Sequence, residues 1–246
     1  MEILYADEKL VVCLKPRGVL STDEPGGMPS LLRAQLGEGT SVYTVHRLDA
    51  AVGGVMVYAR TRHAASDLGK AIQDGRFRKE YRAVITGRPP EPAGTLRDLL
   101  GRDPRRRMTF VANEPGPGVQ AAELSYETLA ERDGLTLLGI VLATGRTHQI
   151  RVQLASRGLP LWGDRKYGAG EGEHIALWSA RIAFDHPRTG ERMNFTAPPP
   201  AGAPWDAFME EEYGLQRPQH HALLSGTGRK IPDAPPHPEN GGREQG

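Results

Sequence analysis

The sequence lacks several features that define common protein classes. Its 246 residues contain one cysteine, Cys13, which excludes a disulfide framework and a cysteine-ligated metal site. No run of about 18 apolar residues occurs, so a membrane-spanning helix is not expected. The N-terminal segment MEILYADEKL has acids where a signal peptide needs a basic region. We therefore expect no membrane association and a reducing compartment, the cytoplasm.

Motifs for nucleotide cofactors are also missing. No G-x-x-x-x-G-K-[ST] segment is present, which excludes a P-loop. The glycine-rich segment YGAGEGEH follows the polar residues GDRKY and not a buried strand, so it does not fit a dinucleotide or S-adenosylmethionine loop. His220, His221 and His237 lack a tetrahedral ligand set. We predict no cofactor and no metal.

The chain as a whole has little excess charge, with 31 Lys or Arg against 30 Asp or Glu. A nucleic-acid partner must therefore be argued from local clustering. Between residues 60 and 107, thirteen Lys or Arg stand against six Asp or Glu. This excess is compatible with an RNA-binding surface, and equally with an ordinary solvated face.

Several segments have the patterns of β-strands. ILYADEKLVVCLKP consists of two β-rich runs around a polar turn, which predicts a hairpin. GVMVYA and LTLLGIVLATG are expected strands, and RIAFDHPRTGERMNF predicts a late hairpin. KEYRAVITG alternates, so Tyr81, Ala83 and Ile85 share one face.

Three segments predict helices between these strands. PSLLRAQLG has Pro29 in its first turn, and TRHAASDLGKAIQDG has Thr61 as N-cap. In THQIRVQLASRG we expect Thr147 as N-cap, with His148 and Arg151 together on a face away from the apolar residues. The mixture predicts an α+β protein. We expect one domain over residues 1–214 and, because residues 215–246 are polar and rich in Pro and Gly, a disordered tail.

A cluster of polar residues, HRLD, directly precedes the apolar segment GVMVYA. Alone it is ambiguous, because a buried Arg–Asp pair at the entrance of a strand is often structural. However, HRLD, KEYRAVITG and ATGRTHQIRVQL occur in this order, each at the boundary of an element. Together with ILYADEKLVVCLKPRG, LPLWGDRKYG and HPRTGERMNFTAPPP, they resemble the RluA-type pseudouridine synthase family.

The resemblance implies a fold and a reaction. The fold would be a mixed, mostly antiparallel sheet with flanking helices and a central catalytic cleft. The reaction would isomerise chosen uridines in structured ribosomal or transfer RNA to pseudouridine without a cofactor. We expect a monomer that binds RNA.

The resemblance also implies roles for residues of the active site. Asp49 would be the essential carboxylate, acting as nucleophile or base while the glycosidic bond breaks, the base turns and a bond forms at C5. Arg151 would keep Asp49 ionised, with Arg146 as the less favoured candidate. Tyr81 would stack on the uracil and take part in proton transfer at C5, although a core tyrosine fits its strand position equally well.

Further residues would contact the substrate or RNA. Arg47 would bind RNA or fill the gap that the flipped nucleotide leaves, and His46, Arg146 and His148 are the other candidates. Base flipping costs a few kcal/mol, which phosphate contacts along a basic surface offset.

The sequence departs from the family pattern directly after HRLD. The family continues with two variable residues and then Thr-Ser-Gly, whereas this chain has Val52, Gly53 and Gly54. The absent hydroxyls would hydrogen-bond backbone at the turn that carries Asp49. We expect either a looser loop or different packing there.

Two rival functions are compatible with these residues. A catalytically weak relative would bind RNA as a folding or assembly factor. A carboxylate-based hydrolase acting on a nucleoside or sugar bond would need a second carboxylate as acid. Glu80 is the nearest candidate along the chain, but alternation on a strand points it away from Tyr81.

Overall fold

The computed structural model describes residues 1–168, 170 and 172–208. The predicted tail, residues 215–246, lies outside this range. The elements are β1 (Ile3–Ala6), β2 (Leu10–Lys15), α1 (Met28–Leu36), β3 (Tyr43–Thr44), β4 (Gly53–Ala59), α2 (Arg62–Gln73), β5 (Arg78–Thr86), β6 (Ala93–Asp103), β7 (Met108–Ala112), β8 (Gln120–Arg132), β9 (Leu135–Leu142), α3 (Gln149–Ala155), β10 (Leu177–Asp185), β11 (Arg192–Thr196) and a 3₁₀ helix, η1 (Trp205–Phe208).

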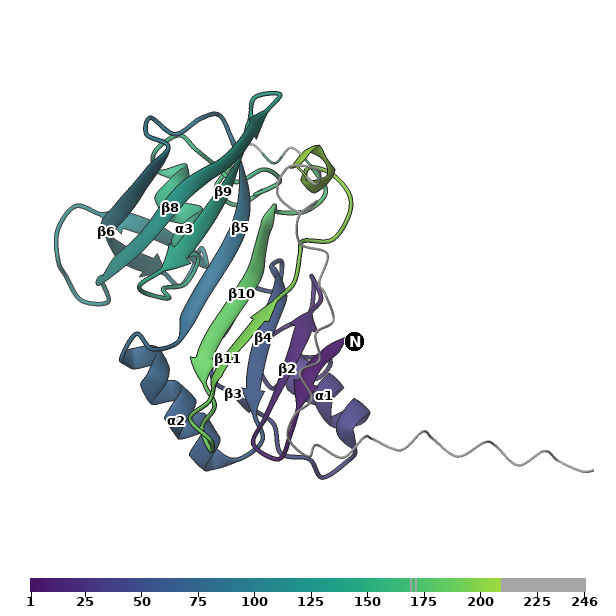
Figure 1. Ribbon diagram of the computed structural model, residues 1–246. Coiled ribbons are helices and arrows are strands. Elements are labelled where there is room, and N and C mark those ends of the chain that lie inside the picture. The colour runs from purple at the N-terminus through teal and green to yellow at the C-terminus, as the bar shows by residue number, and fades with distance from the viewer. Residues whose placement is uncertain (169, 171, 209–246) are drawn as a thin grey trace, which may run out of the picture.

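One sheet runs through the described residues. Its order is β1-β2-β4-β10-β5-β9-β8-β6-β7, with β11 on β10 and β3 on β4. The β4–β10 pair is parallel, and the other pairs in this sheet are antiparallel. Figure 1 shows β5 running between the part of the sheet that contains β10 and β4 and the part that contains β8 and β9. The predicted α+β class and mostly antiparallel sheet are confirmed.

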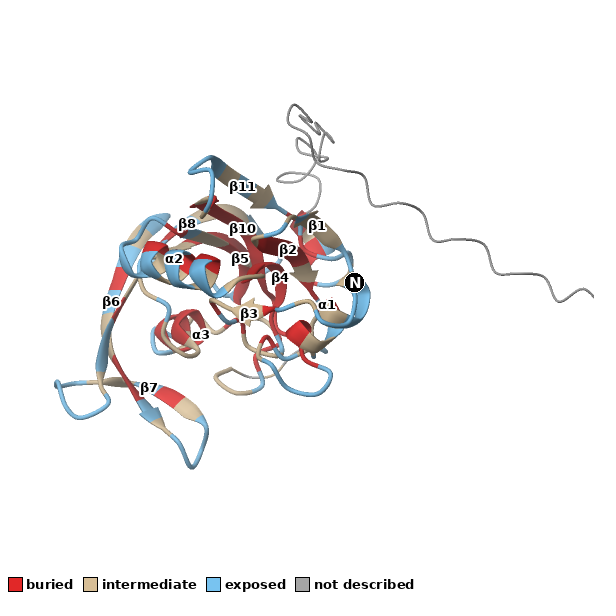
Figure 2. Ribbon diagram, turned by 90° about the horizontal axis from the view of Figure 1, so that it is seen from below, coloured by how far each residue is buried: buried red, intermediate tan, exposed pale blue. Residues whose placement is uncertain are grey.

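The two faces of the sheet are covered by different helices. On β4, Met56 faces the cluster that includes α1 and α3, whereas Val55 and Val57 face the cluster that includes α2. This alternation follows from the two-residue period of a strand. The buried positions of the sheet appear as a central red zone in Figure 2. Helices α1 and α3 therefore share the face on which the HRLD and HQIR segments meet.

Most local predictions are confirmed. The N-terminal and late hairpins form as β1–β2 and β10–β11. Thr61 caps α2 by accepting the Ala64 N–H at 3.2 Å. The predicted N-cap at Thr147 is wrong: α3 begins after His148, which has left-handed backbone angles. The Gln149 side chain folds back and accepts the Arg146 N–H at 2.9 Å, so Gln149 holds the entry to the helix.

The basic stretch of residues 60–107 does not form one surface. It passes through α2 on one face of the sheet, along β5, and into the β6–β7 hairpin, which Figure 2 shows extending from the body. Several of its cations are paired with acids, including Arg97 with Glu123 at 2.9 Å and Arg78 with Glu80 at 2.7 Å. The stretch is therefore spread over several parts of the sheet, and its use as an RNA-binding surface stays a prediction. None of the helices in the described part of the chain has the length and apolar character that a membrane crossing requires.

Candidate active site

Asp49 lies in the turn between β3 and β4. The Val52 N–H donates to the Asp49 carbonyl at 3.0 Å, and the Gly18 N–H donates to the Ala50 carbonyl at 2.8 Å. These backbone bonds fix the turn against the segment that follows β2. The Asp49 side chain is 25% exposed. The loop thus holds a partly exposed carboxylate in a defined place.

Lys15, at the end of β2, stabilises the same turn through hydrogen bonds to backbone carbonyls. It is completely buried, and its Nζ donates to the carbonyls of Pro16 (2.9 Å), Val19 (2.6 Å) and Ala50 (3.1 Å). Burial lowers the pKa of Lys15 to about 8, against the attraction of Asp49. The three carbonyls use all three donors of the ammonium group. Sequence reasoning missed this residue, although a lysine at the end of an apolar strand before proline was a visible signal.

Arg151 on α3 is the direct partner of Asp49. Its NH1 lies 3.0 Å from Asp49 Oδ2, so the structure brings the two predicted residues together. The rest of the guanidinium forms a bidentate pair with Asp164, with Nε–Oδ2 at 2.8 Å and NH2–Oδ1 at 2.7 Å. A planar guanidinium held at both ends has little rotational freedom. Arg151 therefore presents one N–H group to Asp49 in a fixed direction.

Asp164 is a residue of the site that sequence reasoning missed. It is 1% exposed, and its Oδ1 also accepts the backbone N–H groups of Lys166 (2.9 Å) and Tyr167 (3.2 Å). Burial alone would raise the pKa of this carboxyl, but the hydrogen bonds and charge of Arg151 and the two N–H groups outweigh it and lower the pKa. Asp164 is therefore an anion that anchors Arg151.

His148 and Tyr167 extend this network. His148 Nε2 lies 3.7 Å from Asp49 Oδ2, and its Nδ1 lies 2.7 Å from the Tyr167 hydroxyl. The same hydroxyl accepts the Thr109 N–H from β7 at 2.7 Å. Burial is the main cause that lowers the pKa of His148, so the imidazole is neutral at pH 7. As predicted, His148 and Arg151 face the same way, and both face Asp49.

Tyr81 occupies β5 on the same face of the sheet. It is 5% exposed and belongs to the core cluster with Ala83 and Ile85, as the alternation predicted. Burial raises its pKa well above the ordinary value, and the charge of Asp49 raises it further. The phenol therefore lies close enough to Asp49 to sense its charge and stays protonated at neutral pH. Both interpretations of Tyr81, core residue and neighbour of the carboxylate, agree with this position.

The remaining predicted contacts fall in different places. Arg47 is exposed and makes no hydrogen bond or ion pair with the residues that the structure describes. Arg146 does not pair with Asp49 in the described structure, because its Nε donates to the Ala121 carbonyl at 3.0 Å. The predicted RNA contact by His46 disagrees with its position.

His46 is buried against Phe77, with the ring centroids 5.4 Å apart. Its Nε2 accepts the Val57 N–H at 3.2 Å. Burial lowers its pKa to about 3, so it is a neutral core residue and unable to reach an RNA surface.

The missing Thr and Ser hydroxyls after HRLD are explained by packing. Val52 is buried in the core, and a Cβ at Gly53 would lie 2.5 Å from the Trp178 ring. Gly54 has φ +126°, and a Cβ there would lie 2.3 Å from the Ser179 carbonyl of the neighbouring strand. Trp178 thus takes the space that a serine at position 53 would need. The loop is different in packing and remains held by backbone bonds.

The carboxylates near Asp49 do not form a hydrolase pair. Asp164 has a lowered pKa and cannot serve as a proton donor near neutral pH. Glu80 binds Arg78 at 2.7 Å and Arg181 at 2.8 Å. Within the described ranges, no group of three His, Cys, Asp or Glu is arranged to hold a metal. Of Asp49, Asp164 and Glu80, only Asp49 is available beside a fixed cation.

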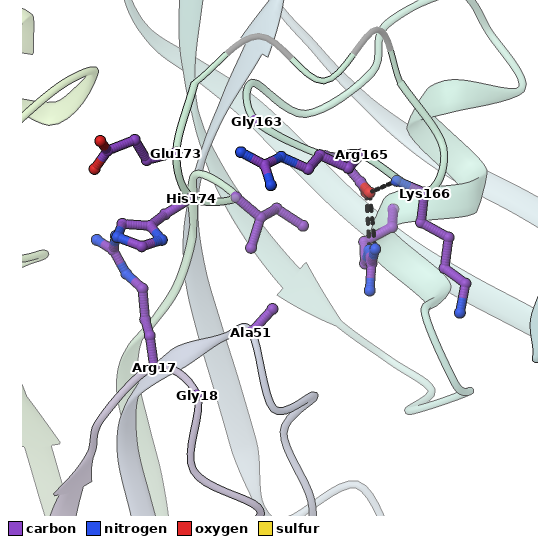
Figure 3. A pocket seen from close by; sticks show the side chains of 11 residues that line it. Arg17, Gly18, Ala51, Gly163, Arg165, Lys166, Glu173 and His174 are labelled. Atoms are coloured by element: carbon purple, nitrogen blue, oxygen red, sulfur yellow. Dashed lines mark hydrogen bonds and ion pairs between the residues drawn. The ribbon is translucent and has the colours of Figure 1, made fainter.

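A cavity of about 400 Å³ adjoins this site. It is lined by Arg17, Ala51, Arg151, Asp164, Arg165 and Lys166, among others, and Figure 3 shows these side chains from close by. Ala51 belongs to the turn that carries Asp49, and Arg151 binds Asp49, so the cavity shares a wall with this site although Asp49 itself does not line it.

Comparison with known proteins identifies the class to which this fold and site belong. Residues 9–156 match the family model described as RNA pseudouridylate synthase. An uncharacterized RNA pseudouridine synthase of Bacillus subtilis is 34% identical over 81% of this chain and 73% of its own length. One from Chloroflexus aurantiacus is 41% identical over 64% of this chain, which spans half of that protein.

Two further similarities agree. The ribosomal large subunit pseudouridine synthase D of Neisseria meningitidis is 31% identical over 81% of this chain and 58% of its own length. The fold is similar to the structure of human RNA Pseudouridylate Synthase Domain Containing 1, with TM-score 0.69, 23% identity, and coverage of 81% of this chain and 83% of that chain. The chain belongs to the RNA pseudouridylate synthase family, which confirms the family and enzyme class predicted from the sequence.

Proposed function

We propose that this protein isomerises specific uridines in a structured RNA, ribosomal or transfer, to pseudouridine, with Asp49 as the catalytic carboxylate. The observation that carries the proposal is the position of Asp49: a partly exposed carboxylate on a braced turn, 3.0 Å from a guanidinium that Asp164 holds in place. A nearby positive charge favours the ionised form that a nucleophile or base needs. One relative is named for the ribosomal large subunit, which supports ribosomal RNA among the substrate candidates.

The chemistry needs few protein groups. The bond between C1′ and N1 of uridine breaks, the uracil turns, and C5 bonds to C1′; C5 then loses its proton and N1 gains one, so the product is an isomer. Asp49 acts at C1′, either by attacking it or by accepting a proton from the sugar. Tyr81 supports the uracil as a protonated phenol. No oxidant, reductant or external group enters the balance.

The proposal also includes a role for Arg47 and a location in the cytoplasm. Arg47 is exposed two residues before Asp49 and makes no bond to the described part of the chain, so it is available to a phosphate or to the stack from which the nucleotide is flipped. We propose that the protein acts as a monomer in the cytoplasm; the single cysteine, Cys13, is buried and compatible with a reducing environment.

The test is release of tritium from C5-labelled uridine in unmodified ribosomal and transfer RNA. We expect release by the wild type and a loss of at least about a thousandfold for Asp49→Asn, as for removal of an essential nucleophile or base. The matched control is Asp133→Asn, because Asp133 lies in a distant turn at φ +52°, which asparagine also adopts. Wild-type turnover by Asp49→Asn would remove Asp49 from the mechanism. RNA binding without release by the wild type would favour the assembly-factor function.

A further inference from the structure

The cavity next to Arg151 is lined by helix α3 and by three separated segments. Arg17 and Gly18 come from the segment after β2, Ala51 from the turn that carries Asp49, and Arg165 and Lys166 from the loop after α3. Figure 3 shows these segments facing one another around the opening. The site chemistry described above uses Arg151 and Asp164 at one wall and leaves the rest of the cavity unassigned.

The unassigned walls of this cavity are positively charged. Arg17 and Arg165 make no hydrogen bond or ion pair with any residue that the structure describes. Asp164 is neutralised by Arg151. Glu173 also lines the cavity, but its carboxylate points away from Arg165 in Figure 3. Arg17 and Arg165 are therefore cations without internal partners in the described structure, whereas Lys166 Nζ donates to the Arg107 carbonyl at 2.6 Å.

Arg17 is the cation with the least favourable surroundings. It is only partly exposed, and burial lowers its pKa. Taking a charge out of water without an opposite charge is unfavourable, and a bound anion would offset that loss. Beside it, Gly18 has φ +83°, and a Cβ there would meet no atom within 4 Å. The backbone at Gly18 thus leaves open space in the wall of the cavity.

We propose that Arg17 and Arg165, with Lys166 at the rim, form a binding site for a backbone phosphate of the RNA directly next to the target uridine. This inference rests on the proposed function and extends it to the phosphate that the site recognises. A guanidinium offers two parallel donors that match phosphate oxygens, and the cavity has room for such a group.

The location of the cavity gives this phosphate a role in the reaction. When the uracil separates from C1′ and turns, the ribose remains attached to the RNA chain through its phosphates alone. A phosphate fixed beside Ala51 and Arg151 keeps C1′ near Asp49 during that step. Arg17 and Arg165 are in this sense positioning residues that act through the backbone of the substrate.

The experiment measures binding of two probes, uridine and uridine 3′,5′-bisphosphate, by isothermal titration. Wild-type protein should bind the bisphosphate at least about tenfold more tightly than uridine, because charge-assisted hydrogen bonds to phosphate are strong. Arg17→Gln/Arg165→Gln should lose most of this preference. Arg17→Lys/Arg165→Lys, which retains the charges without the fork geometry, should keep part of it.

The control is Arg188→Gln. Arg188 lies in the β10–β11 turn, at the opposite end of β10 from Ile175, which lines the cavity. This variant should keep the full preference for the bisphosphate. Melting temperatures of the variants should not fall below that of the wild type, since neither Arg17 nor Arg165 bonds to the described protein and Arg188 forms only an exposed pair with Glu8.

The outcomes separate this inference from the proposed function. The inferred phosphate site is wrong if the wild type binds both probes equally at millimolar concentration or binds neither. It is also wrong if the glutamine variant keeps the preference for the bisphosphate. Both conclusions hold even when tritium is released from RNA. If the preference is present and lost in the glutamine variant while no RNA releases tritium, the anion site stands and the proposed isomerisation fails. With turnover present, the glutamine variant should also raise KM and weaken the salt dependence of RNA binding.

Discussion

Substitution of Asp164 by Asn tests the network that holds Asp49, the carboxylate for which we propose a catalytic role. The change keeps the shape of the side chain and removes its charge. Oδ1 now receives three bonds, from Arg151 NH2 and from the N–H groups of Lys166 and Tyr167, and Oδ2 receives the Arg151 Nε at 2.8 Å. If the asparagine oxygen keeps the three bonds, its NH2 group must face the Nε–H, so two donors confront each other.

The size of the effect follows from burial. Asp164 is 1% exposed and the Arg151 side chain 9%, so they form a buried ion pair, and in the variant Arg151 keeps only the partly exposed Asp49 as an anionic partner. Breaking such a pair costs about 3–5 kcal/mol in the free energy of unfolding. Because the pKa of Asp164 is lowered in the folded protein, the contribution is present above the ordinary aspartate value of about 3.9 and is lost as pH falls through the folded value. The difference between wild type and variant should therefore be largest near neutral pH and shrink in acid.

Urea unfolding at several pH values, read together with tritium release, is the assay. The matched control is Asp23→Asn, since Asp23 and Arg33 form the same bidentate pair, at 2.5 and 3.1 Å, with side chains that are 57% and 35% exposed. Loss of an exposed pair should leave stability nearly unchanged. Equal losses for the two variants, or a loss for Asp164→Asn that does not shrink in acid, would refute the reasoning. In turnover, kcat should fall more than RNA affinity, because Arg151 loses its anchor.

Two further predictions concern the turn that carries Asp49. The pKa of Lys15 is about 8 in the folded protein, below its ordinary value near 10.4. Folding should therefore become more favourable by up to ~3 kcal/mol as pH rises from about 8 to 10. Urea titrations of the wild type and of Lys15→Met should show this rise in the wild type alone. Gly53→Ser should destabilise the fold by about 1–3 kcal/mol, since the added Cβ meets the Trp178 ring. The effect of Trp178→Leu on stability should be less favourable in the wild type than in Gly53→Ser, where it removes the clash. Thermal melts of the two single variants and the double variant measure this coupling.

Local patterns in the sequence predicted the elements better than their arrangement. The alternation around Tyr81 and the cap at Thr61 depend on neighbouring residues, and both are confirmed. The order of the sheet depends on long-range pairing: β10 lies between β4 and β5, parallel to one and antiparallel to the other. No periodicity within a strand specifies its neighbour. The N-terminal boundary of α3 after His148 was also missed, because the side chain of Gln149, within the helix, holds the segment that leads into it.

The site was predictable where the chemistry lies in short motifs and unpredictable where it depends on burial. Asp49 and Arg151 are predicted because HRLD and HQIR resemble the motifs of the family, and the structure brings the two side chains to 3.0 Å. Asp164 and Lys15 appear in the sequence as ordinary charged residues in a loop and at a strand end. Their importance arises only because folding removes both from water and gives each a full set of partners. His46 shows the converse, since its place in HRLD suggested a substrate contact and its burial excludes one.

The departure at Val52 and Gly53 shows how the same turn can be held by different means. Hydroxyls at these positions would form hydrogen bonds with the backbone of the turn itself, which do not depend on the rest of the protein. Here the turn is closed by backbone bonds to Asp49 and Ala50, and the space beside Gly53 is filled by Trp178, whose indole N–H donates to the Ala197 carbonyl at 2.9 Å. Local hydrogen bonds have been exchanged for packing between β4 and β10. The position of Asp49 consequently depends on the sheet itself, so substitutions of Trp178 should alter the position of the Asp49 carboxylate even though Trp178 lies on β10 and not in the turn.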